Sequence, residues 1–163
     1  MNAKDVIRDL FKTNDFLVNE YLKDFNDADL LVRPVQGANH MAWQLGHLIH
    51  SEVQMLHAIA GAPKYELPSA WATQYTKETS RAESPAGFLT KAEYLETYRK
   101  VRAHSLEVLA NIPEPILDKA TEGKLAAIAP TIGSLLALIA NHPMMHVGQF
   151  VVMRRKLGKP VVI

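Results

Sequence analysis

The 163-residue sequence contains no cysteine, which excludes disulfide bonds, thiolate metal ligands and a cysteine nucleophile. It also has almost no net charge, because 18 lysines and arginines face 17 aspartates and glutamates. This balance gives no indication of a nucleic-acid partner or of an anionic membrane surface. The N-terminal segment mixes acidic and basic residues with apolar ones, unlike a signal peptide. We therefore predict a cytoplasmic protein without a nucleic-acid partner.

A long uninterrupted apolar run is also missing. The most apolar stretch, residues 125–140, is broken by Pro130, Gly133 and Ser134. It is too short and too interrupted for a membrane span, so we expect no membrane partner. Apolar residues make up 48% of the chain and charged residues 21%, as in globular proteins. The length predicts a single domain over residues 1–163.

The sequence has no β-hairpin signal and no internal repeat, and its apolar residues recur at helical spacing instead. Four helices are predicted: residues 4–25, residues 40–60 with Asn39 as N-cap, a helix from the capping box Thr90 to Glu93 until just before Pro113, and a helix from near Thr131 towards Leu157. Helices of this number and length predict an all-α four-helix bundle.

The helical periodicity fails between the second and third predicted helices, over residues 61–88, where prolines, glycines, Trp71 and Tyr75 occur. We therefore predict a long loop between helices 2 and 3. A loop of this length is uncommon inside a compact domain and is often functional, for example as a lid. A solvated connection with incidental aromatic residues remains the alternative.

Two histidines lie one helical turn apart on the fourth predicted helix, His142 and His146. They share a face with Leu135, Leu138, Met145, Gln149 and Met153, so we expect the pair to point into the core. Buried imidazoles need hydrogen-bond partners, and a metal ion could bind both rings at once. A pair of core histidines that satisfy one another is the alternative interpretation.

Pro143 stands between these two histidines. A proline inside a helix removes one backbone hydrogen bond and clashes with the carbonyl four residues earlier, here that of Ile139. The residue before a proline also avoids helical geometry, which concerns His142. We therefore expect the helix to kink or to restart at this position.

The second predicted helix carries four more histidines, His40, His47, His50 and His57. His47 is best placed to meet the pair on the fourth helix, because Gly46 lets another backbone approach closely. His40 is too near the helix N-terminus, and His50 and His57 are expected at the surface. Glu52 falls within the apolar arc and needs a partner or a role, for which a hydrogen bond to a ligand is one candidate.

The third predicted helix carries charged residues and one histidine. Arg99, Lys100 and Arg102 are expected to form a solvated face, and His104 an exposed position on the helix.

The segments "MAWQLGHLIHSE" and "NHPMMHVGQFVVMRRKLGKP" together resemble the DinB-like superfamily of four-helix-bundle metalloproteins, over almost the whole chain. That family has a histidine in a W-x-L-x-H-L segment and a second motif, H-x-x-x-H-x-G-Q. The resemblance implies that His47, His142 and His146 bind a divalent transition metal, zinc or nickel before others. Three imidazoles would leave an open position for water or substrate.

Motifs of other chemistries are absent: there is no H-E-x-x-H, no E-x-x-H and no glycine-rich phosphate loop. Some similar proteins are thiol S-transferases that use mycothiol or bacillithiol, and one is a thiol-dependent isomerase. The resemblance therefore implies a metal-dependent transferase, or a hydrolase, that acts on a small electrophilic substrate, with a low-molecular-weight thiol as cosubstrate. A non-catalytic, stress-associated metal- or ligand-binding protein and a purely structural bundle remain alternatives.

We expect the substrate pocket between the second and fourth helices, under a roof that contains Trp71 and Tyr75. Polar groups expected nearby are Gln149, Glu52, Tyr75 and Asn141. Because two sides of the second helix need burial, a homodimer is predicted.

Overall fold

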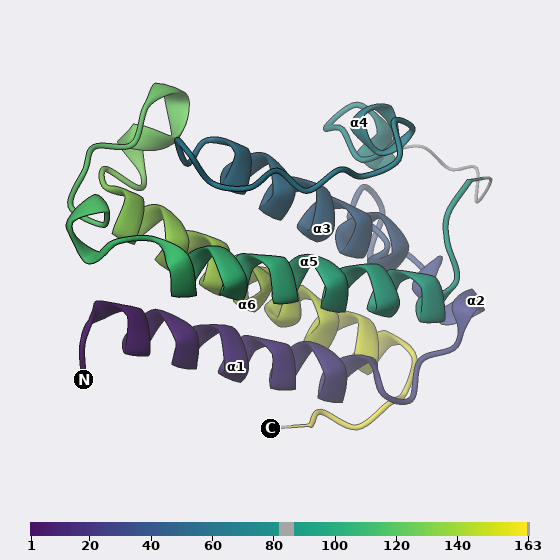
Figure 1. Ribbon diagram of the computed structural model, residues 1–163. Coiled ribbons are helices and arrows are strands. Elements are labelled where there is room, and N and C mark those ends of the chain that lie inside the picture. Colours follow the sequence, from purple (N-terminus) through teal and green to yellow (C-terminus); the bar gives the residue numbers. More distant parts are fainter. Residues whose placement is uncertain (82–86, 163) are drawn as a thin grey trace.

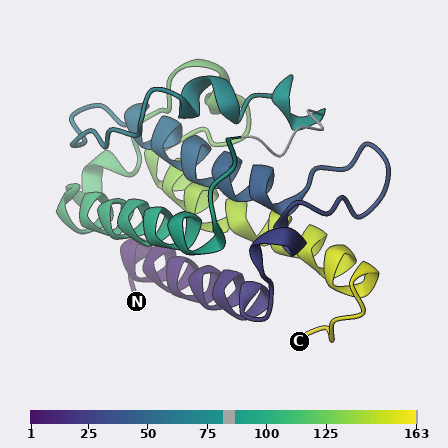
Figure 2. The ribbon, with the colours of Figure 1, turned by 90° about the vertical axis from the view of Figure 1, so that its right-hand side faces the viewer.

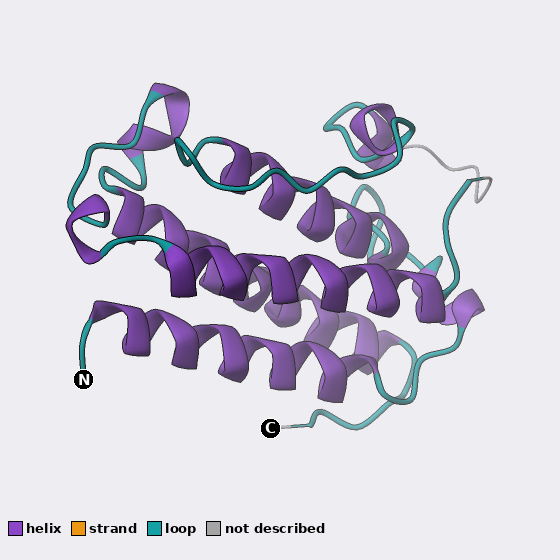
Figure 3. Cartoon of the chain, in the orientation of Figure 1, coloured by secondary structure: helices purple, strands orange, loops and turns teal. Residues whose placement is uncertain are grey.

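The computed structural model describes residues 1–81 and 87–162, and every regular element within these ranges is a helix (Figure 3). The long helices are α1 (Ala3–Leu22), α3 (Met41–His57), α5 (Lys91–Asn111) and α6 (Ile132–Lys156) (Figure 1). The short ones are α2 (Asp27–Leu30), α4 (Trp71–Gln74) and the 3-10 helices Thr79–Arg81, Glu114–Ile116 and Gly123–Ala127. The prediction of an all-α four-helix bundle is confirmed.

The direction of the helices explains the long loop between α3 and α5. α1 and α6 run in one direction, and α3 and α5 both run in the other (Figures 1 and 2). α6 packs along α1 and α3, while α5 closes the bundle against the other side of α1 and α3. Since α3 and α5 are parallel, the connection between them has to return along the whole bundle. Residues 82–86 of the predicted loop lie outside the described residues.

The capping residues set where α5, α6 and α3 begin. Thr90 and Glu93 form the predicted capping box, and the Thr131 side chain caps α6 as predicted. The assignment of Asn39 as the cap of α3 is wrong. The backbone N–H of Trp43 instead donates to Nδ1 of His40, at 3.1 Å. An imidazole nitrogen thus takes the role of the usual side-chain oxygen.

The long loop packs its aromatic residues into the core. Trp71 and Tyr75 are buried, and the hydroxyl of Tyr75 lies 2.8 Å from that of Tyr94 on α5. The ring of Tyr75 lies directly over Gly46 of α3. Gly46 therefore admits an aromatic ring from the loop, rather than the helix backbone that the sequence led us to expect.

Replacing Gly46 with alanine is expected to destabilise the protein by about 1–3 kcal/mol, because the new methyl group would overlap the buried Tyr75 ring. Urea denaturation measures the change in the free energy of unfolding. Gly148→Ala is the matched control, since a methyl group there meets no atom within 4 Å on α6. That control is expected to stabilise by up to about 1 kcal/mol, through helix propensity alone. A destabilised control or an unaffected Gly46 variant would contradict the packing described.

α6 is long and apolar enough to cross a membrane by length and composition alone. The core helix of a soluble protein meets the same criterion. In this bundle α6 packs against α1 and α3. Near its end, buried Arg154 forms a bidentate pair with Asp24, with N–O distances of 2.6 and 2.9 Å. The helix is therefore apolar along its packed face and carries one buried, paired charge near its end.

Candidate metal centre

Three histidines converge where α3 packs against α6. His47 comes from α3, and His142 and His146 come from α6. One ring nitrogen from each can be chosen so that all three lie within 4.8 Å of one another, and the ring centroids are 5.1–5.4 Å apart. His146 is buried and the other two are half-buried. The structure thus brings together the histidines that the sequence singled out.

The side chain of Gln44 fixes the protonation of His146. Its amide nitrogen donates to the backbone carbonyl of Asn39 at 2.9 Å, so its amide oxygen is the atom that faces Nδ1 of His146, at 3.0 Å. An oxygen can only accept, and Nδ1 must therefore carry the proton. The lone pair of Nε2 is left free for a metal. Sequence reasoning missed Gln44, although a glutamine one turn before His47 on a buried helix was a signal.

The ring of His47 is held by Trp43. The two rings are stacked, with centroids 4.8 Å apart and planes only 7° from parallel. The indole N–H of Trp43 donates to the hydroxyl of Thr79 in the long loop, at 3.3 Å. The loop thus supports the histidine cluster through Trp43.

The three imidazoles fit a metal because they are neutral near pH 7. Burial, and then the neighbouring His47 and Arg102, lowers the pKa of His142 to about 4. Burial, and then the two other histidines of the cluster, lowers the pKa of His146 to about 3. Burial, and then the neighbouring His50, also lowers the pKa of His47. Within the described residues the group holds three nitrogen donors and no carboxylate. Such a donor set suits zinc, nickel and similar ions rather than magnesium or calcium.

Pro143 interrupts the backbone hydrogen bonds of α6 without ending the helix, so of the expected kink or restart the restart does not occur. Because Pro143 has no N–H, the carbonyl of Ile139 lacks its usual donor. Arg102 of α5 supplies one, from Nη1 to the Ile139 oxygen at 3.3 Å, and its Nη2 lies 3.4 Å from the oxygen of Ala140. An arginine side chain thus replaces the missing backbone donor, one turn before His142.

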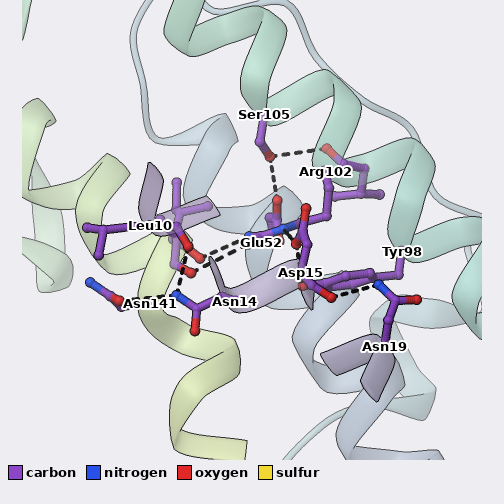
Figure 4. A network of polar contacts seen from close by, with 12 residues as sticks. Leu10, Asn14, Asp15, Asn19, Glu52, Tyr98, Arg102, Ser105 and Asn141 are labelled. Carbon is purple, nitrogen blue, oxygen red and sulfur yellow. Dashed lines mark hydrogen bonds and ion pairs between the residues drawn. The ribbon is translucent and has the colours of Figure 1, made fainter. Parts of the chain in front are cut away.

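The prediction that Arg102 is solvated is also wrong, since its side chain is 2% exposed. Its Nε donates to Asp15 of α1 at 2.7 Å and its Nη1 to Glu52 of α3 at 3.1 Å (Figure 4). Glu52 also accepts from the hydroxyl of Ser105, at 2.5 Å. The partner of Glu52 is therefore Arg102, and the hydrogen bond to a cluster histidine comes from Gln44 instead. Arg102 ties together the two helices that carry the cluster.

The other histidines near the loop contact the backbone rather than the cluster. A ring nitrogen of His57 lies 3.1 Å from the carbonyl oxygen of Tyr65, and one of His104 lies 2.9 Å from that of Pro63. Both rings are half-buried, as is His50. The loop therefore covers part of the His57 and His104 rings, which are less exposed than expected.

A pocket of about 400 Å³ opens beside His47 and His142, between α3 and α6 as predicted. The prediction that Trp71 and Tyr75 cover this pocket is wrong. Leu125 and Ile128, from the segment before α6, form its wall, whereas Trp71 and Tyr75 lie in the core.

The polar groups expected near the pocket do not line it either. Asn141 accepts from the amide of Asn14 at 3.2 Å, and Gln149 is exposed, as is Met145. The face of α6 that carries His142 is therefore a flank of the bundle and not its centre.

Replacing Gln44 with leucine is expected to weaken zinc binding by roughly 10–100-fold, because the His146 ring loses the acceptor that fixes its tautomer. Competition with a chromophoric chelator measures the affinity. Gln44→Glu keeps an acceptor and should retain most of the affinity. Gln54→Leu, at an exposed position on the same helix, is the control and should leave it unchanged. Equal affinities for all variants would exclude this role of Gln44.

Comparison with known protein families gives a match to the DinB superfamily over residues 13–150. The matched stretch contains all three histidines of the cluster. No protein with a curated functional description matches the chain at a significant level.

Proposed function

The chain belongs to the DinB superfamily, and from this premise we propose that it binds one divalent transition metal, zinc or nickel, through His47, His142 and His146. The observation that carries the proposal is the convergence of three ring nitrogens within 4.8 Å. The stacked Trp43 and the hydrogen bond from His146 to Gln44 hold two of the rings in place. Such supporting contacts accompany metal-binding histidines in general.

We further propose that the site is catalytic. Structural zinc sites usually have four protein ligands, whereas catalytic ones have three and an open position. Here two of the three histidines of the cluster, His47 and His142, border a pocket of about 400 Å³. When bound, a divalent metal supplies Lewis acidity that favours the deprotonated form of a thiol or a water molecule. The chain's residues hold the rings, keep them neutral and shape the pocket.

The pocket favours a transferase over a hydrolase. Among the described residues that line it there is no carboxylate to serve as a general base. A nucleophile that loses its proton easily is therefore preferred, and a thiol, with a pKa of about 8–9, does so far more readily than water. The chain has no cysteine, so the thiol would be a low-molecular-weight cosubstrate. The other substrate would be a small electrophile.

A conjugation assay tests this activity. Metal-loaded protein is incubated with N-acetylcysteine or 2-mercaptoethanol and 1-chloro-2,4-dinitrobenzene, and the thioether product is followed by absorbance. The expected result is a rate above the uncatalysed one that a chelator abolishes, zinc or nickel restores, and His142→Ala lacks. Hydrolysis of 4-nitrophenyl acetate instead would support the hydrolase. Metal binding without either reaction would support a non-catalytic, stress-associated binding protein.

We also propose a cytoplasmic homodimer without nucleic-acid or membrane partners. Most of α3 is buried within the chain itself, so α3 does not require a second copy. Phe16 of α1 and Val152 of α6 are exposed apolar side chains that a second copy would cover. Light scattering during size-exclusion chromatography measures the mass directly.

A further inference from the structure

We propose that the pocket beside the histidine cluster binds the apolar body of a neutral alkyl or aryl substrate. The proposal rests on the function proposed above and names the substrate class of the same site. Apart from the histidines, the lining consists of five apolar side chains, Met55, Leu125, Ile128, Leu138 and Met145, and of two uncharged polar ones, Ser51 and Gln54. A volume of about 400 Å³ lies within the range of small-molecule sites.

The rim of the pocket exposes apolar surface that lacks a cover. Ile128 is 69% and Met145 66% exposed. Among the described residues they are the most exposed large apolar side chains after Met1. They come from different elements, the segment before α6 and α6 itself, yet they line the same pocket. Exposed apolar surface gathered at one concave place is typical of a binding site.

The two polar side chains of the pocket already have partners. The hydroxyl of Ser51 donates to the backbone carbonyl of His47. The amide nitrogen of Gln54 lies 3.4 Å from a ring nitrogen of His50. Neither provides a charge that could recognise an ionic ligand.

Charged side chains do not contribute to the pocket in the described part of the chain. Among the described residues no Lys, Arg, Asp or Glu lines it. Arg102, whose charge acts on His142, is paired with Asp15 and Glu52. An organic cation would lose water without gaining a counter-ion, which is unfavourable, and an anion would find a counter-ion only in a metal held by the histidines. The chemistry of the lining therefore selects neutral ligands.

Met55 and Met145 allow the pocket to accommodate ligands of different shapes. A methionine side chain is flexible and polarisable, and its sulfur makes favourable contacts with aromatic rings. The pocket therefore fits a class of apolar groups rather than one rigid shape, and it favours rings.

Methionine-methyl NMR of the full-length zinc-loaded protein, repeated after chelation, tests the proposal. The chain has only six methionines, so each signal can be assigned. Benzyl alcohol is expected to shift the signals of Met55 and Met145 while those of Met41 and Met153, buried elsewhere, stay in place. In the chelated protein, where no metal can bind a carboxylate or an amine, benzoate and benzylamine, of similar size but charged, are expected to bind at least roughly tenfold more weakly.

Two charged substitutions at exposed positions identify the site without disturbing the core. Met145→Asp and Ile128→Asp are each expected to weaken benzyl alcohol binding about tenfold. Met144→Asp is the matched control, since Met144 is an exposed neighbour on the same helix outside the lining. It should bind as the wild type does. Circular dichroism establishes that each variant is folded.

Equal binding of the three probes to the chelated protein, or wild-type binding by both lining variants, would overturn the proposal. Because the chelated protein is titrated as well, this outcome is independent of metal binding. Failure to bind metal would refute the proposed function and leave the probe result standing. Failure of the probes with metal binding intact would refute the substrate class alone.

Discussion

Replacing Arg102 with methionine is expected to lower the free energy of unfolding by about 3–5 kcal/mol, because it leaves a buried carboxylate without its counter-ion. The carboxylate is that of Glu52, whose side chain is 3% exposed. Asp15 loses its ion pair at the same time. Urea denaturation measures the loss. Arg99→Met, an exposed arginine on the same helix, is the control and should change stability by less than about 0.5 kcal/mol.

The loss of stability in Arg102→Met should become larger as the pH rises. Burial already raises the pKa of Glu52 above its ordinary value of 4.5, and removal of Arg102 raises it further. The folded variant then binds a proton that the unfolded chain releases above pH 4.5, so its stability falls as the pH rises. Denaturation at pH 5 and pH 8 should show the larger deficit at pH 8. A deficit that is larger at pH 5 would contradict the buried ion pair.

The same arginine should be coupled to Pro143. In Pro143→Ala the new backbone N–H can donate to the carbonyl of Ile139, which in the wild type accepts from Arg102. Arg102→Met should therefore cost about 1 kcal/mol less in the Pro143→Ala background, the contribution of one hydrogen bond. A double-mutant cycle measures this coupling. Identical costs in both backgrounds would show that Arg102 does not act on α6 through this carbonyl.

Removing one histidine of the cluster is expected to weaken zinc binding by roughly a hundredfold or more. The free energy of zinc binding in protein sites is about 10–16 kcal/mol. One of three ligands should contribute roughly a third of a binding free energy of that size. His142→Ala and His146→Ala should show this loss in competition titrations. His50→Ala is the control, since it removes a half-buried histidine of α3 that lies outside the cluster. Wild-type affinity in either cluster variant would exclude that histidine as a ligand.

The helices could be predicted because their signals are local. Apolar spacing within about 20 residues sets each helix, and capping residues such as Thr90 and Thr131 lie next to the ends that they define. The pair His142 and His146 is local for the same reason. The choice of His47 among four histidines on one helix relied on the neighbouring Gly46 and then on the family motif, because spacing alone does not show which side of a helix faces its neighbour.

The supporting contacts could not be predicted, because their partners lie far apart in the chain. Gln44 and His146 are 102 positions apart, and Arg102 and Glu52 are 50. Next to the exposed Arg99 and Lys100, Arg102 looked like one more solvated charge. One signal was overlooked: Arg102 falls in phase with Tyr98 and Ser105, both buried on the inner side of α5. A charge on that stripe requires a buried partner.

The path of the long loop could not be predicted from the sequence either. Its prolines and glycines indicated irregular structure, and Trp71 and Tyr75 indicated a role for it. Whether those rings cover a pocket or enter the core depends on which face of α3 the loop crosses. Gly46 determines which face the loop crosses, because its missing side chain leaves space on α3 for the Tyr75 ring. The loop thereby supports the cluster through Trp43, while Leu125 and Ile128 line the pocket.

The metal content of the purified protein tests the central claim most directly. The protein is prepared without a histidine tag and measured by inductively coupled plasma mass spectrometry beside His47→Ala and His142→Ala. We predict about one zinc or nickel ion per chain, as three histidine ligands would hold, with the ion lost in both variants while circular dichroism shows the same helix content. A wild type that carries no transition metal and also fails to bind added zinc or nickel would contradict the account.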